Sequence, residues 1–259
     1  MNCKNCNKEL LSSYNYCSNC GGKVINKRFN FSFLISEFTS EVLTWDNKLL
    51  KTFWHLLKYP DVVILDYING VRKKYMSPFR FLLIALTLSG LSIYLVRDQA
   101  INGVANFTAN GQQVEGMKNF MNILYDYNSI FTSLLIPFYA FISWLVFANK
   151  KKLNYFEHIV LYTYSQAIFS IIGVISTVAM LFVPSESLTY FSFILIFLWI
   201  CYNMYILKKI FQLTISQSIV KLLFFAVVFL FIFIISIIGF FALMFFIEGP
   251  EFFEQFKPK

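Results

Sequence analysis

The chain has 259 residues, of which 58% are hydrophobic and 14% are charged, and its formal net charge is +8. Soluble domains carry about 25% charged residues, so this composition excludes an ordinary water-soluble globular fold. The chain also contains 32 Phe and 15 Tyr, more large aromatic side chains than a soluble core of this size could bury. The composition therefore predicts a membrane protein.

The first expected element is a cysteine-rich head over residues 1–28. Two Cys-x-x-Cys pairs, ten residues apart, are formed by Cys3, Cys6, Cys17 and Cys20. Two short pairs that direct four thiolates at one centre are typical of a tetrahedral zinc site, and Gly21 and Gly22 suit a sharp turn beside the second pair. A disulfide-bonded head and an iron–sulfur cluster are the alternatives. Zinc is favoured because we expect the head in the reducing cytoplasm.

The zinc ion is expected to be structural. A closed shell of four cysteines leaves no open position for water or substrate. About twenty residues cannot bury an adequate core, so the head should fold only with its metal. We therefore expect one structural Zn²⁺ per chain, on a head that binds a cytosolic protein partner or signal.

Residues 29–77 are predicted to form short amphipathic helices. Apolar side chains recur at helical spacing from Phe31 to Trp45. A second stripe follows Asp46, the expected N-cap, and consists of Leu49, Leu50, Phe53, Leu56 and Leu57. Pro60 should open a third helix.

Two arrangements of these helices are open. In the first they lie in the membrane interface, as amphipathic helices with basic rims commonly do, and Arg72, Lys73 and Lys74 contact anionic lipid head groups. In the second they pack on each other as a small cytosolic domain.

The segment from Asp46 to Pro78 carries a specific pattern: a Thr and Leu run before a Pro, then Tyr, Gly, a basic pair, Tyr and Pro. The residues that fit it are Thr52, Leu56, Pro60, Tyr67, Gly70, Arg72, Lys73, Tyr75 and Pro78. With the cysteine head before it and apolar runs after it, this pattern resembles a bacterial membrane family known only as a domain of unknown function. The resemblance implies an inner-membrane protein with a cytosolic zinc ribbon, and it implies no reaction.

Residues 78–248 are predicted to form five transmembrane helices, followed by a short extracytoplasmic tail over residues 249–259. Each helix corresponds to an apolar run close to or above the roughly 20 residues that cross a bilayer. The runs are Phe79–Val96, Ile130–Ala148, Ile159–Val183, Leu188–Leu207 and Leu222–Ile247. The expected fold class is an all-α polytopic membrane protein.

The distribution of basic residues predicts the orientation. Eighteen of the 22 Lys and Arg fall within residues 1–80, between the second and third runs, or between the fourth and fifth. Basic residues concentrate on the cytoplasmic side, so we expect the amino terminus inside the cell, the carboxyl terminus outside it, and the protein in the inner membrane. The same distribution explains the positive net charge without nucleic acid.

The third apolar run has a small and polar face formed by Thr163, Gln166, Ser170 and Thr177. Such faces usually mediate close helix packing, and a solute path is the alternative. Glu157 and His158 at the edge of this run are expected to anchor it at the interface. They are also the only candidates for a lipid-acting catalytic pair.

The leading hypothesis is a non-enzymatic membrane protein whose zinc head binds a cytosolic partner. The alternatives are a transporter or channel subunit, with the solute path along the third run, and a membrane-embedded enzyme acting on lipid.

Overall fold

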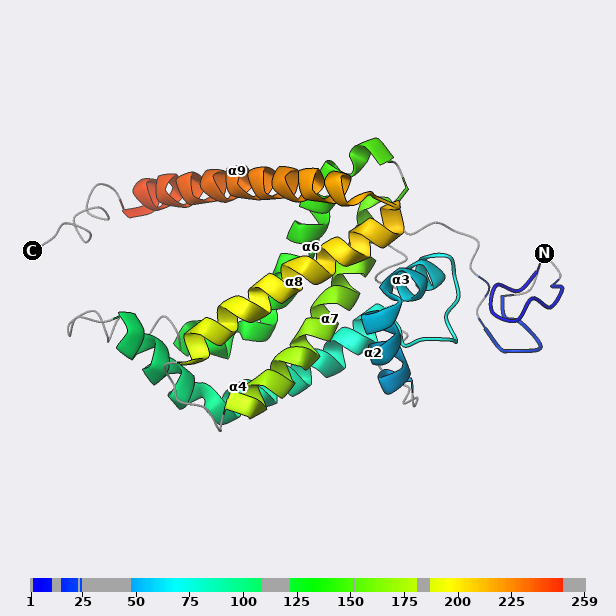
Figure 1. The fold of residues 1–259 in the computed structure, drawn as a ribbon, viewed down its shortest axis with the longest axis horizontal. Helices are drawn as coiled ribbons and strands as arrows, with labels where there is room; N and C mark the ends of the chain where they lie inside the picture. Colours follow the sequence, from blue (N-terminus) through cyan, green and yellow to red (C-terminus); the bar gives the residue numbers. More distant parts are fainter. Residues whose placement is uncertain are drawn as a thin grey trace, which may run out of the picture.

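The computed structural model describes residues 2–10, 15–22, 24, 48–108, 122–150, 152–180 and 187–248. Its regular elements are helical (Figure 1). In chain order they are α2 (Leu49–Lys58), α3 (Pro60–Ile68), α4 (Pro78–Thr108), α6 (Asn128–Val146), the 3-10 helix η2 (Ala148–Lys150), α7 (Tyr155–Met180), α8 (Ser187–Phe211) and α9 (Ile215–Glu248).

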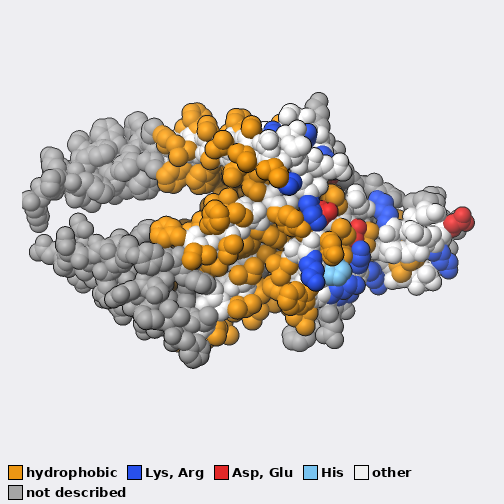
Figure 2. Space-filling model, in the orientation of Figure 1, with side chains coloured by type: hydrophobic (Ala, Val, Ile, Leu, Met, Phe, Trp, Pro, Cys, Tyr) orange, Lys and Arg blue, Asp and Glu red, His pale blue; other side chains and the backbone are white. Residues whose placement is uncertain are grey.

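Five of these helices are long and apolar enough to cross a membrane, which confirms the all-α fold with five candidate spans. The spans are Pro78–Arg97, Asn128–Val146, Tyr155–Val178, Phe193–Phe211 and Ile215–Ile235. Hydrophobic side chains cover the visible surface of these helices, whereas Lys and Arg gather at the end nearest the head (Figure 2).

Helix α7 is the centre of the bundle. In its span 56% of the residues are buried, against 0% in the span of α9. Helix α4 packs along α7 over the most extensive contact in the molecule, and α6 packs on it as well. Helix α9 contacts mainly α6 and α8. It runs from the end nearest the head to the opposite end (Figure 1).

Local sequence explains where α7 and α9 begin. The Asn154 side chain accepts the Glu157 N–H at 2.9 Å, and the Glu157 carboxylate accepts the Asn154 N–H at 2.6 Å. Thr214 and Gln217 form the same reciprocal pair before α9, at 3.3 Å each way. Each pair satisfies backbone donors that a helix start leaves without partners.

Two lysine side chains bind backbone carbonyls at the C-terminal ends of helices. The Lys152 ammonium donates to the Ile210 carbonyl in the last turn of α8. The Lys221 ammonium donates to the Val146 carbonyl at the end of α6 and to the Asn149 side chain at 3.0 Å. Cations are favoured at helix C-termini because the last carbonyls carry partial negative charge. These contacts join neighbouring helices at the end nearest the head.

Helices α2 and α3 pack on each other and on α7 and α8. The Tyr202 and Tyr205 hydroxyls of α8 donate to the carbonyls of Leu56 and Lys58, at 2.9 Å and 3.0 Å. Two of the last carbonyls of α2, which have no partner within the helix, are therefore bound by α8.

The expected apolar stripe of α2 is only partly buried. Leu56 is fully buried and Leu49, Phe53 and Leu57 pack against the core, whereas Leu50 is 67% exposed. The N-cap position belongs to Lys48, while Asp46 lies outside the described residues, as does the segment from Phe31 to Trp45. Pro60 opens α3 as predicted.

Candidate metal centre

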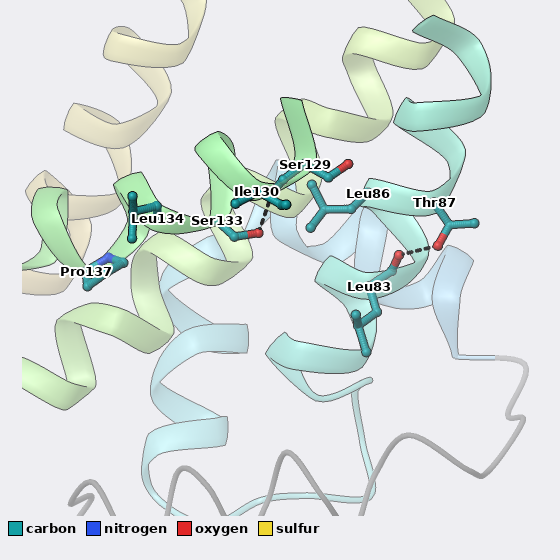
Figure 3. Close-up of a pocket in the computed structure, with 8 residues that line it drawn as sticks. All are labelled: Leu83, Leu86, Thr87, Ser129, Ile130, Ser133, Leu134 and Pro137. Carbon is teal, nitrogen blue, oxygen red and sulfur yellow. Dashed lines mark hydrogen bonds between the residues drawn. The ribbon is translucent and has the colours of Figure 1, made fainter. Parts of the chain in front are cut away.

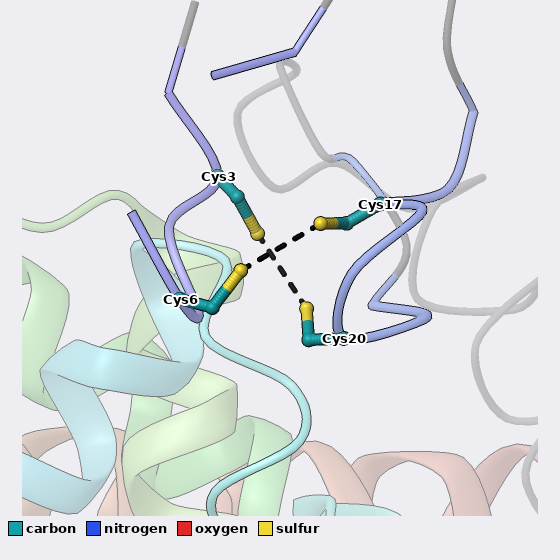
Figure 4. A group of neighbouring side chains, drawn as sticks. All are labelled: Cys3, Cys6, Cys17 and Cys20. Carbon is teal, nitrogen blue, oxygen red and sulfur yellow. Dashed lines mark hydrogen bonds between the residues drawn. The ribbon is translucent and has the colours of Figure 1, made fainter. Parts of the chain in front are cut away.

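The four head cysteines converge on one point (Figure 4). The Sγ atoms lie within 4.8 Å of one another, with Cys3 3.7 Å from Cys20 and Cys6 3.6 Å from Cys17. A tetrahedron with metal–sulfur bonds of about 2.3 Å has sulfur–sulfur edges of about 3.8 Å. A disulfide bond would need about 2.05 Å. The four thiols are therefore unbonded to each other and spaced as ligands of one metal ion.

The two Cys-x-x-Cys pairs form equivalent turns. The Asn7 N–H donates to the Cys3 carbonyl at 2.8 Å, and the Gly21 N–H donates to the Cys17 carbonyl at 2.7 Å. Asn7 and Gly21 both have left-handed backbones, with φ of 60° and 61°, and Asn and Gly are the residues that adopt this conformation most readily. The predicted turn at Gly21 is confirmed, whereas its counterpart at Asn7 was missed.

The electrostatics of the cluster favour a bound cation. The Lys8 backbone N–H and the Asn19 amide, 3.6 Å from the sulfur, lower the pKa of Cys6 to about 6. The Gly22 N–H also favours the Cys20 thiolate, but burial and the three neighbouring thiols raise the pKa of Cys20 to about 11. Four adjacent sulfurs cannot all ionise without a compensating charge, and a metal ion supplies that charge.

The described part of the head has almost no core apart from its cysteines. Its buried hydrophobic residues are Cys3, Leu10 and Cys17, with Val24 and the other two cysteines packed around them. Such a small apolar cluster cannot offset the entropy of ordering the chain. A metal ion at the centre would supply the missing stabilisation.

The predicted lipid-binding residues contact protein groups. The Arg72 guanidinium lies 3.6 Å from the centre of the Tyr67 ring. The Lys74 ammonium lies 2.8 Å from the Asp66 carboxylate, and this hydrogen bond raises the pKa of Lys74. Lys73 is exposed. Contact with anionic lipid head groups stays a prediction for all three residues.

The polar face of α7 lies partly inside the bundle. Thr163 and Ser170 are buried, and the Thr163 hydroxyl donates to the Ile159 carbonyl of its own helix at 2.7 Å. Gln166 and Thr177 are half-buried. Burial of these side chains agrees with helix packing, while a solute path along this face stays untested.

A shallow cavity of about 640 Å³ that is open to the surface lies between α4 and α6 (Figure 3). The Thr87 and Ser133 hydroxyls at its wall donate to the carbonyls of Leu83 and Ser129 in their own helices. None of the four polar residues of α7 lines this cavity. Its wall is formed by Leu83, Leu86, Thr87, Ser129, Ile130, Ser133, Leu134 and Pro137.

Glu157 and His158 are both buried. The Glu157 carboxylate caps the N-terminus of α7, as described above. The His158 ring stacks on Phe211, with ring centres 5.9 Å apart. Glu157 therefore stabilises the start of α7, and His158 packs on α8 through Phe211. No contact among the described residues assigns either side chain to catalysis.

A buried hydrogen bond between α7 and α8 was not predicted from the sequence. The Ser165 hydroxyl donates to the Asn203 side-chain oxygen at 2.8 Å, and the Asn203 amide donates to the Trp199 carbonyl at 2.8 Å. Ser165 and Asn203 are buried. The sequence feature that could have indicated this hydrogen bond is Asn203, the only amide side chain in the fourth apolar run.

The fold and the site together define a class: a helical multi-pass membrane protein with a four-cysteine group near its amino terminus. A family model described as "Protein of unknown function (DUF3667)" matches residues 46–90. The matched segment contains α2, α3, the loop after them and the first part of α4. It therefore includes all nine residues of the pattern noted in the sequence and excludes the four head cysteines. No curated protein and no solved structure matched the chain.

Proposed function

We propose that the chain is a multi-pass protein of the bacterial inner membrane whose cytoplasmic head, built on a structural zinc ion, binds a protein partner. The four-cysteine cluster carries the proposal. A closed shell of four thiolates suits Zn²⁺ and leaves no position for a substrate, so the centre stabilises a binding surface and does not catalyse a reaction.

The orientation rests on the basic residues near the head. Lys152, Lys209 and Lys221 lie at the ends of α7, α8 and α9 nearest α2 and α3. Lys and Arg resist translocation, which supports a cytoplasmic position for that end. In the reducing cytoplasm the cysteines would stay available to the metal.

Tyr16 is the best candidate for the partner contact. Its side chain is 62% exposed, although it directly precedes the buried ligand Cys17. Exposed Tyr residues held on a rigid framework are typical hot spots of protein interfaces. The metal would supply that rigid framework in a head of this size.

Photo-crosslinking in living cells tests the proposal. A photoreactive phenylalanine analogue at position 16 should crosslink to a discrete protein, and the adduct should disappear in the Cys17→Ser variant. The same analogue at Tyr94, which lies on the first span and is 77% exposed, should not give that adduct. An adduct that survives Cys17→Ser would contradict a metal-supported binding surface.

A further inference from the structure

The two head turns differ in what the asparagine before the second cysteine contacts. Asn5 and Asn19 occupy the same place in the two turns, directly before the second cysteine of each pair. The Asn19 amide faces the cluster and lies 3.6 Å from the Cys6 sulfur. The Asn5 side-chain oxygen instead accepts the backbone N–H groups of Arg72 at 3.1 Å and Lys73 at 3.3 Å. Asn5 therefore joins the head to the loop that precedes α4.

The glycines of the second turn leave the space that this contact needs. A Cβ atom added to Gly22 would lie 2.6 Å from the Asn5 amide nitrogen, and one added to Gly21 would lie 3.3 Å from the Lys73 ammonium. Gly21 needs to be glycine for its backbone conformation as well, but Gly22 has no positive φ. The close approach of Asn5 thus gives a separate reason for a small residue at position 22.

The receiving loop is held by the rest of the protein. The Met76 N–H donates to the buried Thr52 hydroxyl of α2 at 2.9 Å, and the Met76 carbonyl accepts the Tyr164 hydroxyl of α7 at 2.7 Å. The Arg72 guanidinium rests on the Tyr67 ring of α3. Two successive backbone N–H groups held in this way form a small preorganised site for one acceptor oxygen.

The position of Asn5 depends on the metal centre. Asn5 lies between Cys3 and Cys6, in a turn whose shape is set by the convergence of the four sulfurs. Without metal, the described head residues have too little core to keep that turn. Loss of the metal should therefore remove the Asn5 oxygen from the two N–H groups.

We propose that the metal-loaded head is latched onto the juxtamembrane loop through Asn5, and that loss of the metal opens this latch. The inference rests on the proposed zinc head. It adds that the metal state decides whether the Arg72 and Lys73 N–H groups donate to the Asn5 oxygen or to another acceptor. The loop contacts α2, α3 and α7, so the latch connects the cysteine cluster to the membrane-spanning bundle.

Amide hydrogen exchange on the full-length protein in lipid nanodiscs tests the latch. Exchange at Arg72 and Lys73 should be slow in the zinc-loaded protein, and chelation should accelerate it by roughly tenfold, the effect of one lost hydrogen bond. The Met76 N–H, which is bound to Thr52, should keep its protection and serves as an internal reference. Unchanged exchange at Arg72 and Lys73 after complete zinc removal would overturn the proposal.

Three variants separate the latch from the metal site. Asn5→Ala should accelerate exchange at Arg72 and Lys73 while one zinc per chain remains bound, and chelation should add little further acceleration. Asn5→Asp keeps an acceptor oxygen and should keep the protection, as should Asn19→Ala at saturating zinc. Normal protection in zinc-loaded Asn5→Ala would refute the latch alone, whereas absence of zinc from the wild-type protein would refute the proposed head.

Discussion

The Tyr164 hydroxyl donates a buried hydrogen bond to the Met76 carbonyl, 2.7 Å away. The Tyr164 ring also packs edge-on against Tyr67, with ring centres 5.9 Å apart. Through these two contacts the central helix α7 holds both α3 and the loop before α4. The segment matched by the family model is thus attached to the most buried helix of the bundle.

Replacing Tyr164 with Phe should destabilise the protein. The change removes only the hydroxyl and leaves the Met76 carbonyl buried without this donor, at a cost of about 1–3 kcal/mol. We expect a lower apparent Tm in detergent than for Tyr94→Phe, because Tyr94 is 77% exposed on the first span. Equal Tm values for the two variants would show that the Met76 contact contributes nothing measurable.

Thr52 should be more sensitive to loss of its hydroxyl than to loss of its methyl group. Thr52 is fully buried and its oxygen accepts the Met76 N–H. Thr52→Val keeps the shape but leaves a buried donor unsatisfied, at a cost of about 1–3 kcal/mol, whereas Thr52→Ser keeps the acceptor. Thermal unfolding followed by tryptophan fluorescence should therefore place Thr52→Val below Thr52→Ser. The reverse order would argue that packing, and not the hydrogen bond, holds the loop.

Ser165 and Asn203 should show an energetic coupling. Their hydrogen bond joins α7 to α8 inside the bundle, and such bonds in membrane proteins contribute about 0.6 kcal/mol on average. A double-mutant cycle with Ser165→Ala and Asn203→Ala should give a coupling of that order. Strictly additive effects would mean that the two side chains stabilise the bundle independently.

Zinc binding should weaken as the pH falls. The pKa of Cys20 is raised to about 11, so this thiol carries its proton at both pH 8 and pH 6 and must release it when the metal binds. Each proton that must leave on metal binding costs about tenfold in affinity per pH unit. Competition with a fluorescent zinc chelator at pH 8 and pH 6 measures this. Equal affinities at both values would exclude thiolate ligands.

Reporter fusions test the orientation. A reporter active only in the cytoplasm should work after residue 28 and after Lys152, and it should fail after Gly111 and after Lys259. The reason is the basic-residue bias, which alternates at each of the five expected crossings. A cytoplasmic signal after Gly111 would place the cysteines outside the cell. In that oxidising environment a disulfide-bonded head would be favoured over a zinc site.

The sequence by itself determined the class, because its strongest signals are local. An apolar run of about 20 residues needs no partner to be read as a membrane helix, and two Cys-x-x-Cys pairs bring their ligands together over short stretches of chain. Five candidate spans and the four-cysteine cluster were predicted on these grounds, and both are confirmed.

Only the tertiary structure decided which polar groups meet. Asn5 and Arg72 are 67 residues apart in the chain, and Met76 and Tyr164 are 88 apart. No periodicity or motif spacing links such positions, because the contacts arise when α2, α3 and the loop after them pack onto α7 and α8. The exposed position of Leu50 has the same origin. A stripe of five apolar residues shows which face of a helix can be buried, whereas the neighbouring helices decide how much of that face they cover.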